Sequence, residues 1–469
     1  MPKAPASSHF PLSPPHSTPL LRASQLLALL LTGAAYWALA YATPRAHCTQ
    51  LLLLFAVAGT AYAWLLHTRL PLRWGLGAAL VFRLLWLPAT PALSDDFYRF
   101  RWDGLLVSDG HNPFAETPQQ LLQHPPADSA ALPMTELRRL RPRLNSPRYF
   151  SVYPPVCQGL YGVAAGLFPD SQTGFLLVVR LALLLADAGA AALLLWLLPL
   201  AGWPARRALA YLLHPLAIVE VAGNVHMEGV AVFFLLLTGA LLVRRRTWLA
   251  AGALALAVAT KLLPLLALPL LARQLGRRRF RWFLGVLAGS LGLLFLPFVS
   301  WSLLLHIGLS LDLYFQSFEF NASVFYLLRA LGQWLTGHDL VGGLGPLLGA
   351  GAIYLAFRLA RGVGRPRLAA VPHWLLLTLS GYFALATIVH PWYLVPLVAL
   401  SCFSPLRYAR VWAGLAVLSY SAYRTTAYTE SGWLIGLEYG GTLAWAAWEY
   451  RRGRAAGAVG RVRQGQETG

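Results

Sequence analysis

Long apolar runs, separated by short polar segments, recur along nearly the whole chain. An α-helix needs about 20 apolar residues to cross the hydrocarbon core of a bilayer. The pattern therefore predicts an all-α polytopic membrane protein with about 11 to 14 transmembrane helices, although several runs are shorter than a perpendicular crossing requires. The predicted segments are residues 22–42, 50–67, 74–93, 175–197, 207–222, 228–243, 247–260, 262–273, 281–299, 340–358, 371–389, 393–405, 410–424 and 432–449.

Arginine gathers in the short loops between these segments, and none of those loops contains an acidic residue. Cytoplasmic loops of membrane proteins carry such an excess of basic residues. The arginine-rich loops and both chain termini are therefore predicted to be cytoplasmic. The loops hold Arg69 and Arg73; Arg206 and Arg207; Arg244, Arg245 and Arg246; Arg273, Arg277, Arg278, Arg279 and Arg281; Arg358, Arg361, Arg365 and Arg367; and Arg407 and Arg410.

This orientation constrains two further apolar stretches. A full crossing by residues 153–168 would place Arg206 and Arg207 outside, so this stretch is predicted to be a re-entrant or interfacial helix on the outer side. The same interpretation applies to residues 323–336. Irregular backbone at membrane depth is tolerated where it lines a protein cavity, so the two stretches indicate a cavity that opens on the outer side.

The remaining chain divides into two tails and one large loop. Residues 1–20, rich in Pro, Ser and His, are predicted to be a disordered cytoplasmic tail, and residues 450–469 a basic cytoplasmic tail. Residues 21–449 form the predicted transmembrane catalytic domain. Within it, residues 94–152 form an outer-face loop with short helices, and seven acidic residues balance seven arginines there.

Composition narrows the class further. Of 469 residues, 57% are hydrophobic and 12% are charged, about half the charged fraction of a soluble domain. This balance excludes a disordered chain and an ordinary soluble enzyme. The net charge of +20 is spread over many loops rather than one face, so we expect no nucleic-acid partner. Three widely spaced cysteines support neither a disulfide framework nor a zinc site.

The outer loop begins with two adjacent carboxylates, Asp95 and Asp96. Carboxylates at a membrane exit are costly unless they are solvated, paired or bound to metal. They could act as a general base or hold a divalent cation such as Mg²⁺ or Mn²⁺. A helix start held by salt bridges to arginine is the equally weighted structural alternative.

Further polar residues lie close to span ends. Glu220, Asn224, His226 and Glu228 surround one predicted turn, where a solvated polar turn is the alternative to a binding site. Lys261 lies inside an apolar region of a chain that has only one other lysine. Intramembrane lysines are functional candidates, and a compact ammonium suits a phosphate contact, although a lysine near a span end can also extend to the interface.

Two other features complete the set. His390 precedes Pro391 at the outer end of a span, where it could donate to an anion or simply mark a proline turn with aromatic anchors. Asp187, two helical turns from Arg180, is predicted to be structural. The sequence contains no phosphate-binding glycine loop, dinucleotide fingerprint or serine-hydrolase motif.

The ordered set of motifs resembles the polytopic GT-C glycosyltransferases that use polyprenyl-phosphate sugars. It is most similar to the mannosyltransferase branch that includes GPI mannosyltransferase I and bacterial polyprenyl-phosphomannose-dependent enzymes. Each motif alone is weak, but the set covers residues 95–393 in family-like order. The matching segments are Asp95–Gly104, Gly110–Phe114, Tyr153-Pro154-Pro155, Asn224–Glu228, Lys261–Pro264 and His390–Tyr393.

The resemblance implies a GT-C-like bundle and an inverting transfer of a hexose, expected to be mannose, from a polyprenyl-phosphate donor. The acceptor would be a hydroxyl group of a lipid, glycan or protein. It implies Asp95 or Asp96 as the base, although a strict D-x-D motif is absent. That departure leaves open which carboxylate acts and whether a metal is bound. The candidates for the donor phosphate are Lys261, His226, His390, Arg99 and Arg101; those for substrate positioning are Glu228, Asn224, Tyr98, Trp102 and Asn321.

Two other functions compete with transfer. A transporter or flippase for lipid-linked sugars also needs ionisable groups in a membrane cavity, but it favours inverted repeats, and none is evident. An outer-face polysaccharide ligase or polymerase would likewise place its charges outside. The composition favours a bacterial inner-membrane protein whose active site faces the periplasm.

Overall fold

The computed structural model describes residues 18–125, 132–312, 318–424 and 428–466, so the predicted tail 1–20 falls almost entirely outside the described residues. Within this part of the chain every regular element is a helix. A single isolated parallel β-bridge joins Phe320 and Ile388. The predicted all-α class is therefore confirmed.

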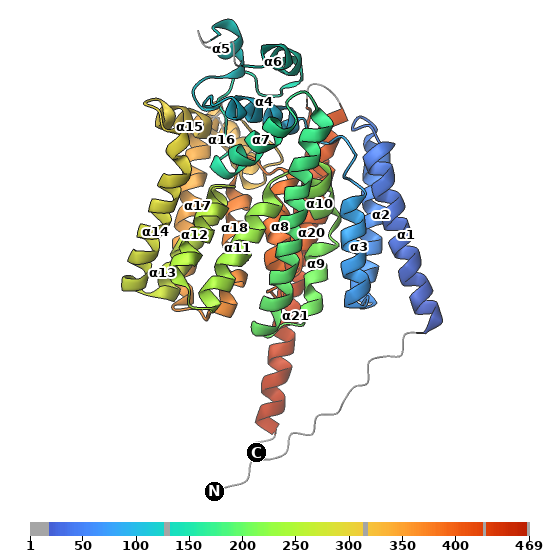
Figure 1. Ribbon diagram of the computed structural model, residues 1–469. Coiled ribbons are helices and arrows are strands. Elements are labelled where there is room, and N and C mark those ends of the chain that lie inside the picture. The colour runs from blue at the N-terminus through green and yellow to red at the C-terminus, as the bar shows by residue number, and fades with distance from the viewer. Residues whose placement is uncertain (1–17, 126–131, 313–317, 425–427, 467–469) are drawn as a thin grey trace.

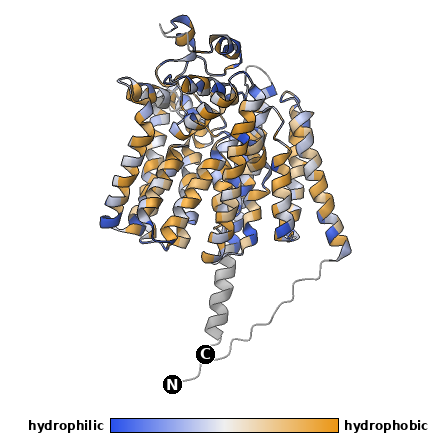
Figure 2. Ribbon diagram, viewed as in Figure 1, coloured by the Kyte–Doolittle hydropathy of each residue, from blue (hydrophilic) through white to orange (hydrophobic). Residues whose placement is uncertain are grey.

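Six helices in the described part of the chain are long and apolar enough to cross a membrane. Large apolar side chains on their outward faces are exposed, such as Trp282 (74%) and Leu293 (72%) on α14. Figure 2 shows apolar residues along the flanks of the bundle, as expected where lipid covers the protein. The chain is thus an integral multi-pass membrane protein. The six are α1 (Pro19–Tyr41), α2 (Cys48–His67), α8 (Gln172–Leu200), α14 (Arg277–Phe295) with η6 (Leu296–Phe298), α17 (Val341–Val363), and η8 (Leu368–Ala370) with α18 (Val371–Leu385).

The segment 207–222 is broken into short pieces and bends sharply. It forms η3 (Ala205–Ala208), α9 (Leu209–Leu212), α10 (Pro215–Ile218) and the π-helical η4 (Val219–Gly223). The piece Pro215–Gly223 meets α11 (Glu228–Val243) at 111°, and counting this bent pair as one span gives up to seven. The turn between them, residues 224–227, carries the predicted polar cluster.

Several other predicted spans are also short or broken, and prolines at the first helical turns mark many of the breaks because proline lacks a backbone N–H. Each predicted apolar segment contains helix, while the number of complete crossings remains a prediction. The short elements are α3 (Leu72–Leu84), α12 (Thr247–Val258), η5 (Leu263–Ala267), α13 (Leu268–Leu275), η9 (Pro391–Leu394), α19 (Val395–Ser401), α20 (Tyr408–Leu415) and η10 (Ala416–Arg424). The predicted segment 432–449 instead lies in one long helix, α21 (Gly432–Gln466).

Short helices gather at one end of the bundle, which we call the cap end (Figure 1). Two of them, α7 and α16, are the stretches predicted to be re-entrant or interfacial, and with 13 residues each they are too short to cross a membrane. The start of α1 and the end of α21 lie toward the opposite end, and α21 continues as a helix to Gln466 through most of the predicted basic tail. The cap-end helices are α4 (Asp96–Ser108), α5 (Pro118–Gln123), α6 (Met134–Leu140), α7 (Pro155–Leu167), α15 (Leu303–Asp312) and α16 (Val324–Thr336).

Close packing of α4 on α7 fixes the helix that begins with Asp96. A Cβ atom added at Gly104 would lie 2.4 Å from the backbone oxygen of Tyr161, and one at Gly162 would lie 2.5 Å from the Val107 side chain. Only glycine allows this backbone approach. The contact holds α4 across the cap end rather than along the bundle.

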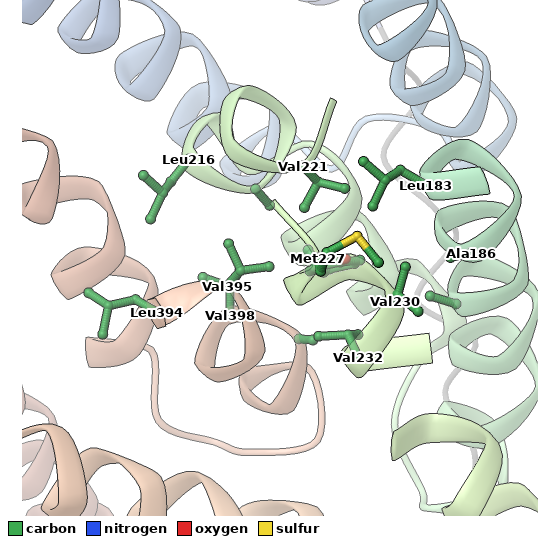
Figure 3. Packing of buried hydrophobic residues seen from close by; sticks show 14 of the residues in the cluster. Leu183, Ala186, Leu216, Val221, Met227, Val230, Val232, Leu394, Val395 and Val398 are labelled. Atoms are coloured by element: carbon green, nitrogen blue, oxygen red, sulfur yellow. The ribbon is translucent and has the colours of Figure 1, made fainter. Parts of the chain in front are cut away.

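The turn at residues 224–227 is anchored in the apolar core by two of its side chains. Met227 belongs to the same buried cluster as Val221, Val230 and Val395, which come from η4, α11 and α19 (Figure 3). Val225 is also fully buried. Because close-packed cores resist displacement, the polar side chains of this turn are held in fixed positions.

Candidate active site

A chain of three ionisable side chains connects α4 to the turn after η4. The Nδ1 atom of His226 lies 2.7 Å from Glu220 Oε2, and its Nε2 atom lies 3.7 Å from Asp96 Oδ2. Glu220 and His226 are buried, whereas the Asp96 side chain keeps 19% of its surface exposed. Asp96 is therefore the member of the chain that a substrate can reach.

Glu220 is held by hydrogen bonds from three sides. Besides His226, its carboxylate accepts bonds from the Tyr420 hydroxyl and from Asn224 Nδ2, the latter at 3.2 Å. The Asn224 side-chain oxygen in turn accepts a bond from the backbone N–H of Leu93 at 3.3 Å. Asn224 thus links the turn to the chain segment that leads into Asp96.

Aromatic stacking holds the His226 ring in place. Trp392 lies between two imidazoles, with ring centroids 4.0 Å from His226 and 4.3 Å from His390 and interplanar angles of 21° and 7°. The other side of His390 contacts Phe320 at 4.7 Å. Nδ1 of His390 is buried and has no hydrogen-bond partner among the described residues.

Lys261 lies at the end of α12 beside the start of α11. Its Nζ is 2.7 Å from Glu228 Oε1 and 4.9 Å from the ring centroid of Tyr393. The start of α7 packs against the same place, because Val156 N–H donates to Ala259 O at 2.9 Å and Cys157 Sγ contacts Thr260 O at 3.3 Å. The predicted re-entrant stretch therefore borders the lysine.

The two adjacent carboxylates diverge. Asp95 pairs with Arg45 at 2.6 Å, while Asp96 accepts a hydrogen bond from Asn145 at 2.7 Å and faces His226. The geometry thus gives Asp95 the salt-bridged role that the sequence left as an alternative. Among the described residues no group of three or more His, Cys, Asp or Glu side chains could hold a metal ion. Asp95 and Asp96 contact different partners, and a divalent cation such as Mg²⁺ or Mn²⁺ held by them stays a prediction.

The two arginines predicted as phosphate ligands are committed to internal contacts. Arg99 Nε pairs with Asp103 at 2.7 Å, and its Nη1 donates to the carbonyl oxygens of Ser146 and Tyr149. Arg101 is fully buried and pairs with Glu136 at 3.2 Å. Their guanidinium groups fasten the outer loop to α4, which favours a structural role.

Three other residues predicted to position the substrate also make internal contacts. Trp102 is 1% exposed and packs in the core, while the ring of Tyr98 contacts that of Phe97 at a tilt of 35°, with centroids 4.0 Å apart. Asn321 is fully buried and donates to Val389 O and to Glu438 at 3.1–3.2 Å. It holds the backbone that leads into His390 rather than facing open space.

The surroundings of Asp96 favour its ionised form. Burial acts to raise the pKa of this carboxyl, but the charge of the nearby His226 ring and the hydrogen bond from Asn145 outweigh it. The pKa of Asp96 is therefore lowered from its ordinary value. A carboxylate that stays ionised and partly exposed can accept a proton from a bound hydroxyl group.

The backbone beside His226 is strained. Val225 has a φ of +58°, which is rare for a β-branched residue. Residues held in such conformations cluster at functional sites and persist where surrounding contacts enforce them. Here the buried Val225 and Met227 side chains flank His226 and fix its direction.

Four contributing residues escaped the sequence-based candidates: Arg45, Asn145, Trp392 and Tyr420. Trp392 lies within the His390–Tyr393 segment and could have been included on that basis. Tyr420 is 200 positions from Glu220, and nothing in the local pattern marks it. Glu220 belonged to the predicted polar turn but was given no role.

Comparison with known proteins gives the class of this protein. The family described as alpha-(1->6)-mannopyranosyltransferase, N-terminal domain, matches residues 21–277, more than half of the chain. The chain therefore belongs to this mannosyltransferase family, and it is a membrane glycosyltransferase. The matched region contains Asp96, Glu220, His226 and Lys261, while His390 lies beyond it. No individual curated protein matches the chain.

Proposed function

We propose that the protein transfers mannose from a polyprenyl-phosphate donor to a hydroxyl group of a membrane-borne glycan, with inversion and with Asp96 as the base. The observation that carries the proposal is the position of Asp96. Its pKa is lowered, its side chain is partly exposed, and it faces His226 and accepts a hydrogen bond from Asn145. Trp392 stacks on both His226 and His390, so the base lies close to a proposed phosphate ligand. Family membership supports the mannosyl transfer.

In the proposed reaction the acceptor hydroxyl attacks the anomeric carbon while Asp96 takes its proton. The bond between that carbon and the phosphate oxygen breaks, and its electron pair leaves with the polyprenyl phosphate. A direct displacement of this kind inverts the anomeric configuration. The linkage in the family's description, α-(1→6), is the one we propose for the product.

Lys261 and His390 are the proposed ligands of the phosphate. An ammonium group and an N–H donor stabilise the negative charge that develops on the leaving oxygen. His226 was also predicted to bind the phosphate. Its ring is directed at Asp96, however, so we assign it the role of orienting the base, Asp96. Glu228 holds Lys261, and the polyprenyl chain would extend among the apolar helices.

The proposed orientation follows the arginine loops. The turn between α13 and α14, which Arg277 directly follows, lies at the opposite end of the bundle from α4 (Figure 1). The positive-inside rule assigns that end to the cytoplasm and the cap end to the outside. In a bacterial inner membrane the active site would then face the periplasm, with both termini cytoplasmic.

The test uses purified protein reconstituted in vesicles that contain a glycolipid extract as acceptor. Mannose label is supplied either on a polyprenyl phosphate or on a nucleotide. The proposal expects transfer from the lipid-linked donor alone, with a product of inverted configuration. Transfer from the nucleotide sugar would contradict it. Movement of intact labelled donor across the membrane without transfer would support a flippase instead.

A further inference from the structure

Glu220 is a buried carboxylate with no place in the proposed chemistry so far. Its side chain has no exposed surface. A buried carboxylate is costly unless a positive group pairs with it and hydrogen bonds satisfy its oxygens. Its contacts are Tyr420, Asn224 and His226, and among these described partners only His226 can carry a positive charge.

The Glu220 contact also determines which way His226 is protonated. Because Nδ1 is 2.7 Å from a carboxylate oxygen, Nδ1 carries a hydrogen and donates it. A neutral ring would then turn the lone pair of Nε2 toward Asp96, which is repulsive. A protonated ring presents Nε2–H to Asp96 instead. The arrangement therefore favours an imidazolium between two carboxylates.

The separation on the Asp96 side is suited to a transient contact. At 3.7 Å, His226 Nε2 and Asp96 Oδ2 are beyond direct hydrogen-bond distance, whereas the Glu220 contact is short. Glu220 thus holds the ring firmly, and Asp96 remains able to turn toward an acceptor hydroxyl. Stacking on Trp392 prevents the ring from following.

We propose that Glu220 is a positioning residue of the transfer reaction, which keeps His226 protonated and directed at Asp96 so that the base stays ionised. This inference rests on the function proposed above. Tyr420 and Asn224 hold Glu220, and Glu220 acts on the base only through His226. The step transfers no atom to Glu220, whose charge is the same before and after the reaction.

Other charged and titratable groups surround this imidazole, so the test must change Glu220 while leaving them intact. Asp96 faces it from α4, Glu228 and Lys261 lie at the adjoining ends of α11 and α12, and His390 lies across Trp392. Tyr420 and Tyr423 come from η10. Glu220→Gln keeps the shape of the side chain, removes its charge and replaces one of its two acceptor oxygens by an NH2 group.

The experiment measures kcat, donor KM and the pH profile of kcat/KM for Glu220→Gln and Tyr420→Phe. Tyr423→Phe, three residues further along η10, is the matched control, since Tyr423 makes no direct contact with Glu220 among the described hydrogen bonds. We expect Glu220→Gln to lower kcat about tenfold with little change in KM, as loss of a charged hydrogen bond suggests. The acidic limb of the profile, which is the pH range in which kcat/KM falls as the pH is lowered, should move to higher pH by about one unit.

We expect Tyr420→Phe to show a smaller change in the same direction and Glu220→Asp, which keeps the charge, to recover part of the rate. Lower activity with an unmoved acidic limb would overturn the inference, because a merely structural carboxylate predicts that result. So would a Tyr423→Phe variant that behaves like Glu220→Gln.

A substrate-free measurement separates this inference from the proposed function. If the unaltered protein transfers no mannose, the proposed function fails. The inference about Glu220 is then tested by comparing the unfolding temperatures of the unaltered protein and of Glu220→Gln between pH 6 and 10. The ion pair stabilises the folded protein while His226 is protonated, and this contribution is lost as the pH rises through its titration. The difference in unfolding temperature should therefore narrow with rising pH. A difference that does not change with pH would overturn the inference.

Discussion

Glu228 and Lys261 form a 2.7 Å ion pair that joins the start of α11 to the end of α12. The carboxylate is 2% exposed and the lysine side chain 27% exposed, so the ammonium group lies between the buried acid and the open side of the site. Glu228 therefore holds the positive charge in place before a donor arrives. An ammonium held in this way needs no large rearrangement to meet a phosphate.

We predict that Lys261→Met raises the KM for the donor roughly 10- to 100-fold, the effect of losing one charge-assisted hydrogen bond. It also leaves Glu228 buried without its partner, so the unfolding temperature should fall. Adding Glu228→Gln removes that stranded charge. The double variant should recover stability but not donor affinity, as measured by thermal unfolding and donor titration.

The double variant also supplies the control for this prediction. If donor affinity returned together with stability, Lys261 would act only through the fold. A Lys261→Arg variant with unchanged KM would indicate that a positive charge is sufficient without the compact shape of the ammonium.

The lowered pKa of Asp96 predicts how the rate depends on pH. A base acts only when ionised, so kcat/KM should hold through the pH range in which ordinary aspartates titrate and fall only at still lower pH. His226→Asn removes the nearby charge that lowers this pKa, while the burial that raises it remains. The acidic limb should then move to higher pH.

This shift is measured by comparing pH–rate profiles of the two proteins with the same donor. The stability of the folded protein should also decrease as the pH is lowered. A carboxylate with a lowered pKa contributes stability above its unfolded-state pKa, which is lost as the pH falls through the folded-state value. An acidic limb that stays in place in His226→Asn would count against this electrostatic coupling.

Much of the site could be predicted because its residues lie at recognisable span ends. Asp96, Asn224, His226, Glu228, Lys261 and His390 are polar residues flanked by apolar runs, and hydropathy alone placed them at one end of the bundle. The helical class followed from the same runs. The break at Pro391 was also predicted, because proline cannot continue a helix without loss of a hydrogen bond. The break at Pro215, within the predicted span 207–222, was not predicted.

Pairings between distant segments could not be predicted. Asp187 was expected to be structural, but the sequence did not name its partner, which is Arg83 of α3 at 2.7 Å. Arg180 instead donates to the carbonyl oxygens of Ala222 and Gly223 at the end of η4. Which arginine reaches a carboxylate depends on how helices pack, and spacing along one helix does not contain that information. The Arg45 contact to Asp95 escaped prediction for the same reason.

The Arg83–Asp187 pair should be purely structural. Both side chains are at most 5% exposed, and Tyr211 also donates to Asp187 at 2.8 Å. Asp187→Asn leaves Arg83 without a counter-charge, which costs about 3–5 kcal/mol for a buried pair. We expect a lower yield and unfolding temperature, with unchanged transfer per folded molecule and an unchanged pH profile. A shifted pH profile would show that this pair is coupled to the active site.

The close contact between α4 and α7 gives a packing prediction. In Gly104→Ala the new methyl group would overlap the backbone oxygen of Tyr161, and overpacking of this kind costs about 1–3 kcal/mol. Because α4 begins with Asp96, transfer should fall along with stability. Gly159→Ala on α7 is the matched control, since a Cβ there meets no atom within 4 Å. Equal effects of the two substitutions on unfolding temperature would contradict the packing argument.

The central claim is that Asp96, and not its neighbour Asp95, removes the acceptor proton. The most direct measurement is single-turnover transfer of labelled mannose from a polyprenyl-phosphate donor by Asp96→Asn and Asp95→Asn in vesicles. Our account predicts that Asp96→Asn lowers the rate at least about 100-fold, the lower range for a general base, with donor binding retained. It predicts that Asp95→Asn, which loses only the partly exposed contact to Arg45, stays within a few fold of the unaltered protein. Unchanged turnover in Asp96→Asn, or a larger loss in Asp95→Asn, would contradict it.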